Sequence, residues 1–224
     1  MTAPRTLLLD FGGTLAIERR SRPALYAAVA SARGLEVDEA RMGALMAEAH
    51  AALPIVCGGH FRYSRGWFER FIEVIFVERL GLSSADLPDA QEELFSVFAD
   101  ARTFRLFPGA LEVLARARRR GHRVAVVSNW SYALAPLLED LGLHPDAVLC
   151  SAVEGLEKPA TALFQRALEQ LGTEAEGALH VGDSLTNDVH GARRAGLDAV
   201  LLDRTGSPAP KGVAVIRSLD EVLP

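Results

Sequence analysis

Long apolar runs, cysteine and lysine are all scarce in this chain of 224 residues. No apolar stretch approaches the roughly 20 residues that a membrane-spanning helix requires, so we expect no membrane partner. The apolar residues 7–9 are too few for the hydrophobic region of a secretory signal. The two cysteines, Cys57 and Cys150, lie too far apart in sequence to indicate a disulfide framework or a Cys-x-x-Cys metal site. We therefore expect a cytoplasmic protein.

Positive charge is also in the minority. The chain has 24 Lys and Arg residues against 29 Asp and Glu residues, which gives a net charge of -5. Because proteins that bind nucleic acid are usually basic, we expect no nucleic-acid partner. Only Lys158 and Lys211 are lysines. A lysine in the middle of a chain that otherwise uses arginine is a candidate functional residue.

Short apolar runs alternate with helical patterns over most of the chain. The runs predict buried strands at residues 6–10, 123–127, 147–150, 178–181, 199–202 and 213–216. The helical patterns, each followed by glycine, cover residues 111–120, 134–141, 161–171 and 188–195. This alternation predicts an α/β protein with a doubly wound, Rossmann-like parallel sheet.

The segment between about residues 17 and 104 has a different character. It contains no convincing strand, and its helical patterns cover residues 23–32, 38–52, 64–80 and 90–101. Phe68, Phe71, Ile72 and Ile75 recur at helical spacing, which predicts the core of a helical bundle. We therefore predict an α/β core domain of residues 1–16 and 105–224. An all-helical domain, residues 17–104, is inserted after the first strand.

Polar residues follow the carboxyl ends of the predicted strands, where open α/β sheets bind their ligands. These residues lie in segments 10–15, 128–130, 157–159 and 182–188. Together the segments offer aspartates, hydroxyls and one ammonium group. A carboxylate at a strand end can attack phosphorus and form an aspartyl phosphate. Neighbouring carboxylates repel one another unless a cation joins them, and a set of oxygen ligands without histidine suits Mg²⁺.

Four motifs in these segments resemble those of the haloacid dehalogenase (HAD) superfamily, a large group of mostly phosphatases. In chain order they are Asp10-x-x-Gly13-Thr14-Leu15, Ser128-Asn129, Lys158-Pro159 and Gly182-Asp183-x-x-x-Asn187-Asp188. Each occurs at a matching strand end, and the resemblance covers nearly the whole chain. The helical insert resembles the C1-type cap of subfamily I of this family.

The resemblance implies roles for the charged residues of these motifs. Asp10 would be the nucleophile, and Lys158 would balance the charge of the transferring group. Mg²⁺ would be bound by Asp10, Asp183 and the backbone carbonyl of Gly12. Asp188 would support or complete this metal site.

The resemblance also implies how the substrate is held. Thr14 and Ser128 would bind the transferring group, and Asn129 would help through its backbone or its side chain. The active site would lie between the core and the cap. The implied activity is that of a Mg²⁺-dependent phosphatase that acts on a small phosphorylated metabolite through an aspartyl-phosphate intermediate. The oligomeric state is left open.

Gly12 departs from the pattern of the family's phosphatases. They usually carry a second aspartate there, which protonates the leaving oxygen and then activates water. General acid–base groups typically contribute ~10²–10⁴-fold to a rate. One interpretation is a phosphatase with compensation. A good leaving group, as in an acyl phosphate or an anhydride, needs little protonation, and a cap residue such as His60 could instead replace the acid.

Two other interpretations stay open. The family's 2-haloacid dehalogenases also lack this aspartate, since halide leaves without a proton, and Asp10 would then form an ester. Those enzymes work without metal and alter the fourth motif, which this chain keeps. In a dehalogenase, Arg19, Arg20 and Arg22 could hold a substrate carboxylate.

The other possibility is a non-catalytic phosphate-binding or regulatory module. Phosphonoacetaldehyde hydrolase, which also has a small residue at this position, is excluded because residues 16–105 contain no lysine for its Schiff base.

Overall fold

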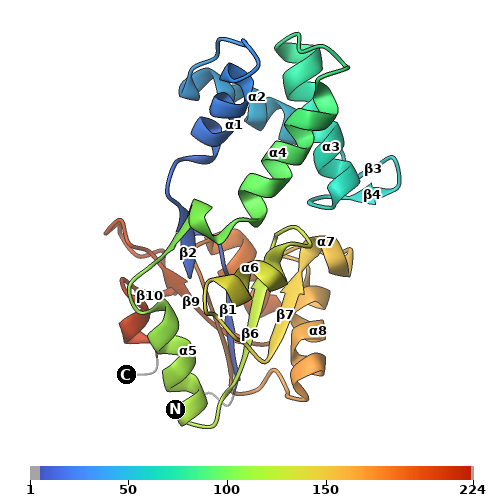
Figure 1. Cartoon of the computed structure of the whole chain (residues 1–224). Coiled ribbons are helices and arrows are strands. Elements are labelled where there is room, and N and C mark those ends of the chain that lie inside the picture. The colour runs from blue at the N-terminus through green and yellow to red at the C-terminus, as the bar shows by residue number, and fades with distance from the viewer. Residues whose placement is uncertain (1–5, 223–224) are drawn as a thin grey trace. The chain divides into compact units, whose positions relative to one another are not determined.

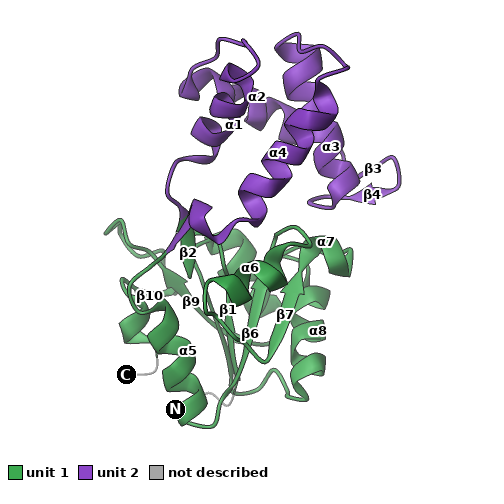
Figure 2. Cartoon of the chain, viewed as in Figure 1, with its two compact units in different colours: residues 1–17, 106–224 green, residues 18–105 purple. Residues whose placement is uncertain are grey.

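The structure, a computed structural model, describes residues 6–222 of the chain (Figure 1). The chain divides into two compact units (Figure 2). Unit 1 comprises Met1–Ile17 and Leu106–Pro224, and unit 2 comprises Glu18–Arg105. Each unit has a hydrophobic core of its own. Within residues 6–222, no helix combines the length and the apolar character needed to cross a bilayer.

Unit 1 is built on a six-stranded parallel sheet with the strand order β10-β9-β8-β1-β6-β7. The strands are β1 (Thr6–Leu9), β6 (Arg123–Ser128), β7 (Ala147–Cys150), β8 (Ala178–Gly182), β9 (Asp198–Leu202) and β10 (Ala214–Ile216). All four residues of β1 are buried, as expected for a central strand of a parallel sheet that is covered on both faces. The predicted doubly wound α/β fold is confirmed.

Helices pack against the sheet of unit 1. They are α5 (Ala110–Arg119), α6 (Leu134–Asp140), α7 (Ser151–Glu154), α8 (Thr161–Leu171) and α9 (Gly191–Arg194). The helix predicted at residues 188–195 begins earlier than expected. A π-helical segment, Leu185–His190, precedes α9, and the Ser184 hydroxyl caps it by accepting a hydrogen bond from the backbone N–H of Asn187. Leu8, Val127 and Phe164 belong to one continuous core formed between the sheet, α8, α9 and the π-helical segment before α9.

The chain leaves unit 1 through β2 (Ala16–Glu18) and returns through β5 (Phe104–Leu106), and these two short strands pair with each other. Between them lie the four helices α1 (Arg22–Ser31), α2 (Glu39–Ala52), α3 (Arg65–Glu73) and α4 (Leu87–Ala99). A π-helical segment, Val74–Arg79, extends α3. Their shared core contains the predicted stripe, with Phe71, Ile72 and Ile75 buried and Phe68 partly buried against them.

Unit 2 also contains a short β-hairpin that the sequence analysis did not predict. Its strands are β3 (Val56–Cys57) and β4 (His60–Phe61). Gly58 and Gly59 connect them with φ angles of 57° and 83°. Positive φ at both central residues is what a two-residue hairpin turn of this kind requires, and a Gly-Gly pair meets that requirement without strain. The insert is therefore helical apart from this hairpin.

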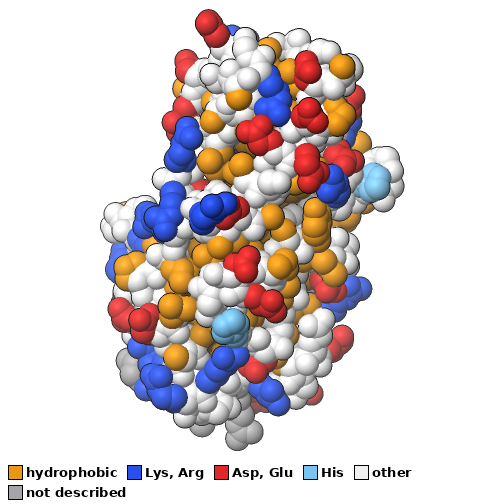
Figure 3. Space-filling model, in the orientation of Figure 1, with side chains coloured by type: hydrophobic (Ala, Val, Ile, Leu, Met, Phe, Trp, Pro, Cys, Tyr) orange, Lys and Arg blue, Asp and Glu red, His pale blue; other side chains and the backbone are white. Residues whose placement is uncertain are grey.

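Charges of both signs are interspersed on the surface. On the face drawn in Figure 3, acidic and basic side chains lie among one another in each unit, and neither sign dominates a large area. Many of the arginines form ion pairs, such as Arg166 with Glu154 in unit 1 and Arg70 with Glu78 in unit 2. Surface arginines of both units therefore pair with surface carboxylates, in contrast to Lys158, which is buried.

Candidate active site

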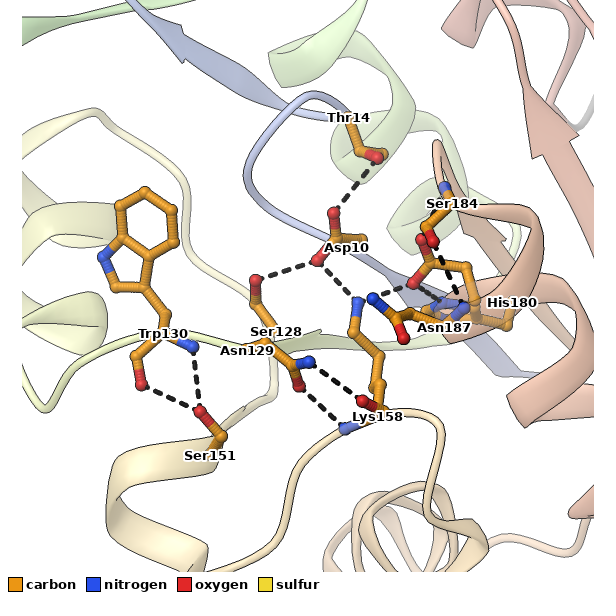
Figure 4. Close-up of polar contacts among 11 residues, drawn as sticks. Asp10, Thr14, Ser128, Asn129, Trp130, Ser151, Lys158, His180, Ser184 and Asn187 are labelled. Carbon is orange, nitrogen blue, oxygen red and sulfur yellow. Dashed lines mark hydrogen bonds and ion pairs between the residues drawn. The ribbon is translucent and has the colours of Figure 1, made fainter. Parts of the chain in front are cut away.

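The carboxyl ends of neighbouring strands bring the predicted polar residues together (Figure 4). Asp10 directly follows β1, and Ser128 is the last residue of the adjacent strand β6. The Ser128 hydroxyl donates a hydrogen bond of 2.8 Å to Oδ1 of Asp10, and the Thr14 hydroxyl lies 3.3 Å from Oδ2. All three side chains are buried. Both oxygens of the candidate nucleophile are therefore held in place by hydroxyl groups.

Lys158 is the charged centre of the site. It lies between α7 and α8, and its side chain is only 3% exposed. Its ammonium nitrogen is 2.6 Å from Oδ1 of Asp10 and 2.6 Å from Oδ1 of Asp188. Burial alone would lower the pKa of Lys158, but the two carboxylates outweigh it and raise this pKa above its usual value. The side chain therefore stays positively charged and ties both carboxylates to one point.

Asp188 has further partners besides Lys158. His180, fully buried in β8, places Nε2 3.0 Å from Oδ1 of Asp188. The backbone N–H of Ser184 donates to Oδ2 at 2.9 Å. Burial would raise the pKa of Asp188, but Lys158 and His180 overcome this effect and hold the pKa well below its usual range. Asp188 is thus a fixed anion at the base of the site.

Asp183 completes a cluster of three carboxylates. One oxygen each from Asp10, Asp183 and Asp188 lies within 4.8 Å of the others. Asp183 is exposed, yet its pKa is raised to about 6, first by the protein atoms that displace water from part of it and then by repulsion from Asp10 and Asp188. A side chain at Gly13 would overlap Asp183, because its Cβ would lie 2.0 Å from Oδ2. Glycine therefore lets the carboxylate approach the loop after β1.

The cluster fits a divalent cation. Its donors are carboxylate oxygens only, which matches the preference of Mg²⁺. One ammonium group faces three carboxylates, so negative charge remains on the cluster. Desolvation is the main cause of the raised pKa of Asp183, and repulsion from Asp10 and Asp188 adds to it. A cation bound by the three side chains would relieve this repulsion.

Asn129 positions Lys158. Its side-chain oxygen accepts a hydrogen bond of 2.7 Å from the backbone N–H of Lys158, and its amide nitrogen donates to the carbonyl of the same residue at 2.9 Å. We expected Asn129 to help in substrate binding through its backbone or its side chain. Because both ends of the side-chain amide are bonded to Lys158, the backbone of Asn129 is the part left for contact with a substrate.

Gly12 lies against the indole ring of Trp130. A Cβ atom on Gly12 would be 3.0 Å from Cζ3 of Trp130, so the ring occupies the space that a side chain at this position would enter. Phe11 packs edge-on against the same ring, with centroids 5.0 Å apart. The Ser151 hydroxyl bonds to the backbone of Trp130 on both sides, accepting from its N–H at 3.0 Å and donating to its carbonyl at 3.2 Å. Ser151 thus fixes the backbone of Trp130, and the ring lies between Phe11 and Gly12.

Arg204 binds the backbone of the loop after β1. Its guanidinium donates to the carbonyl of Gly13 at 2.6 Å and to the carbonyl of Thr14 at 2.9 Å. The guanidinium carbon lies 3.6 Å from the centroid of the Phe107 ring. Sequence reasoning missed Arg204 and His180. For His180 a signal was available. It is a histidine inside a strand predicted to be buried, and a buried polar side chain needs a partner.

The other side chains considered in the sequence lie in unit 2. His60 is exposed in β4, and its ring packs on Gly66, where a Cβ would be 2.5 Å from the ring. Arg22 pairs with Glu18 at 2.6 Å, and Arg20 is exposed beside it in the sequence. Arg22 is therefore already engaged with a carboxylate of its own unit.

Comparison with known proteins gives the family. A sequence model described as haloacid dehalogenase-like hydrolase matches residues 4–196. This chain belongs to that family. Haloacid dehalogenase-like hydrolase domain-containing protein 3 of Bos taurus is 31% identical to this HAD-like hydrolase over 97% of the chain and 88% of its own length.

Two further relatives connect the HAD-like hydrolase to phosphatases and to a solved structure. Phosphoserine phosphatase of Thermus thermophilus is 38% identical over 62% of this chain and 57% of that protein. The HAD-hydrolase YfnB of Bacillus subtilis, in a crystal structure with magnesium bound, superimposes with a TM-score of 0.72. That comparison covers 98% of this chain and 97% of the other at 21% identity. The chain is thus a hydrolase with the α/β fold of its family.

Proposed function

We propose that this HAD-like hydrolase is a Mg²⁺-dependent phosphatase that hydrolyses a small phosphorylated metabolite through an aspartyl phosphate on Asp10. One observation carries the proposal. A buried carboxylate at a strand end is bonded to two hydroxyls and an ammonium group, and it shares a three-carboxylate cluster with Asp183 and Asp188. Relatives named as phosphatases support the same conclusion.

Asp10, Asp183 and Asp188, together with the backbone carbonyl of Gly12, would hold the Mg²⁺ ion. When bound, the ion neutralises charge on the carboxylates and on the phosphoryl oxygens. The fit rests on the oxygen-only donors and on the closeness of the three carboxylates, one oxygen of each lying within 4.8 Å of the others. The magnesium-bound relative supports this choice of metal.

The chain's own groups carry the phosphoryl transfer. An oxygen of Asp10 attacks phosphorus, the bond from phosphorus to the leaving oxygen breaks, and the electron pair departs with that oxygen. Lys158, Ser128 and Thr14 surround the attacking carboxylate, which supports a role for them in binding the transferring oxygens. Water then attacks phosphorus, which releases phosphate and restores the carboxylate of Asp10.

We also propose that the helical insert, residues 17–104, acts as a cap for a core formed by residues 1–16 and 105–224. Closure of such a cap would exclude water from the transferring group. The separate hydrophobic core of the insert supports this assignment, because it allows the insert to move as one body.

The test is turnover of an aryl phosphate by the purified protein with Mg²⁺, with EDTA, and with Mg²⁺ restored. We expect hydrolysis that EDTA abolishes and Mg²⁺ recovers. Asp10→Asn should lose turnover at an unchanged melting temperature, whereas Asp140→Asn, an exposed change at the end of α6, should retain it. Metal-independent release of halide from a 2-chloro acid would instead establish a dehalogenase. Neither activity in folded protein would establish a binding module.

A further inference from the structure

Trp130 occupies the space beside the nucleophile loop where a catalytic acid would have to project. The ideal Cβ position of Gly12 is 3.0 Å from Cζ3 of the indole, and two further ring carbons lie within 4 Å of it. The backbone of Gly12 has no left-handed φ, so its conformation alone would accept any residue. The restriction at this position is therefore the ring and not the main chain.

The main chain of Trp130 is held by hydrogen bonds, and its ring packs against an aromatic neighbour. Ser151 is fully buried and bonds to both backbone polar groups of Trp130, and the backbone N–H of Ala152 donates to the Trp130 carbonyl at 3.2 Å. Phe11, also fully buried, packs edge-on against the indole. Movement of the ring away from Gly12 would break the edge-on contact with Phe11, while the backbone hydrogen bonds fix the main chain that carries the ring. Figure 4 shows the indole of Trp130 on the same side of Asp10 as Ser128.

The groups that contact Asp10 do not supply a replacement acid. The hydroxyls of Thr14 and Ser128 are far too weak as acids, and each is bonded to a carboxylate oxygen. The ammonium group of Lys158 is already bonded to the carboxylates of Asp10 and Asp188. Asp183 has lost its proton whenever it binds a metal ion.

We propose that Gly12 and Trp130 together restrict this enzyme to phosphoryl compounds whose leaving oxygen is stable as an anion, such as acyl, enol and aryl phosphates or phosphoanhydrides. The inference rests on the proposed phosphoryl transfer at Asp10. In that step the bond from Asp10 to phosphorus forms and the bond to the leaving oxygen breaks. The leaving oxygen departs with the electron pair and takes no proton from the enzyme.

The restriction has a measurable size. A positioned general acid typically contributes ~10²–10⁴-fold, and the contribution is greatest when the leaving oxygen is strongly basic. An enzyme without that acid should therefore lose about this factor on alkyl phosphates relative to activated esters. Trp130 is a specificity-determining residue in this account, because it replaces the acid with an apolar wall.

The experiment measures kcat/KM with Mg²⁺ for substituted phenyl phosphates, from dinitrophenyl to unsubstituted phenyl, and for an alkyl phosphate. For the wild-type protein we expect a steep fall in log kcat/KM as the pKa of the leaving group rises. Turnover that is equal for activated and alkyl esters would overturn the inference and leave the proposed phosphatase intact. Absence of Mg²⁺-dependent turnover of every ester would overturn the proposed function, and the inference with it.

Two double variants test the role of the pair directly. Gly12→Asp with Trp130→Ala introduces an acid and makes space for it, and Gly12→Asn with Trp130→Ala is the matched control of nearly equal shape. We expect the Asp variant to turn over alkyl phosphates at least about tenfold faster than the Asn variant and to show a shallower slope. Equal slopes in these two variants, at equal melting temperatures, would contradict the proposal. The wild-type profile decides the matter independently if either variant fails to fold.

Discussion

The ammonium nitrogen of Lys158 lies 2.6 Å from Oδ1 of Asp10, although 148 positions separate the two residues in the chain. The same nitrogen is 2.6 Å from Asp188. One buried cation therefore compensates two buried anions. Removal of a partner from a buried ion pair costs more than its net attraction is worth, because the remaining charge stays buried without compensation.

Lys158→Met should consequently impair both activity and stability. We expect a loss of about 3–5 kcal/mol in the free energy of unfolding, from the buried carboxylates that remain. Turnover of an aryl phosphate should fall by at least about 10²-fold. Denaturant unfolding and steady-state kinetics measure the two effects. Lys211→Met, which changes the chain's other, exposed lysine, should alter neither.

Asp183→Asn should separate metal binding from folding. Burial and then repulsion raise the pKa of Asp183 to about 6, so its ionisation destabilises the folded, metal-free protein, and this cost is fully present above pH 6. Removal of the charge relieves it. We expect the metal-free variant to melt at the same temperature as the wild type or higher at pH 7.5. Mg²⁺ should raise the melting temperature of the wild type but not that of the variant. A clear drop in the metal-free melting temperature would show that Asp183 stabilises the fold instead.

His180→Ala tests the support beneath Asp188. The change removes the imidazole 3.0 Å from Oδ1 of Asp188 and leaves a partly unsatisfied carboxylate in the core. We expect a loss of about 1–3 kcal/mol in the free energy of unfolding and weaker Mg²⁺ binding, since Asp188 would be less well oriented. Urea unfolding with and without Mg²⁺ measures both. His180→Gln, which keeps a donor, should recover part of each loss; equal effects of the two variants would argue against a hydrogen-bonding role.

Arg204→Lys should loosen the loop after β1. Lysine cannot make the two parallel hydrogen bonds to Gly13 and Thr14 while its head group packs on Phe107. We expect faster hydrogen exchange in the peptide that covers residues 10–16 and a lower kcat with a smaller change in KM. Arg166→Lys, at an exposed ion pair on α8, serves as the control and should leave both unchanged. Unaltered hydrogen exchange in residues 10–16 of the Arg204 variant would show that the loop does not need the two hydrogen bonds from Arg204.

The sheet and much of the site could be predicted from sequence because they follow local patterns. Buried strands appear in the sequence as short apolar runs, and the carboxyl ends of parallel strands meet at one edge of the sheet. Those two rules were enough to bring Asp10, Ser128 and Asp183 to one place. The same rules included Lys158, which lies further from its strand, and the scarcity of lysine in the chain gave a second reason to select it.

The remaining features depend on contacts that no local pattern encodes. The ring of Trp130 against Gly12 and the grip of Arg204 on the loop after β1 join segments that are distant in sequence, and their geometry arises from tertiary packing. The hairpin in unit 2 is a different case. Gly58-Gly59 was a visible turn signal there, but the flanking strands of two residues each are too short to show an alternating pattern.

A covalent bond between Asp10 and phosphorus is the central step of the proposed reaction. Mixing the enzyme with Mg²⁺ and an activated aryl phosphate, quenching in acid within milliseconds and analysing peptides by mass spectrometry tests for that bond. We expect one phosphoryl group on the peptide that contains Asp10, absent when EDTA replaces Mg²⁺ and absent in Asp10→Asn. Steady turnover with no phosphoryl group on that peptide, or with the group on another residue, would contradict the central claim.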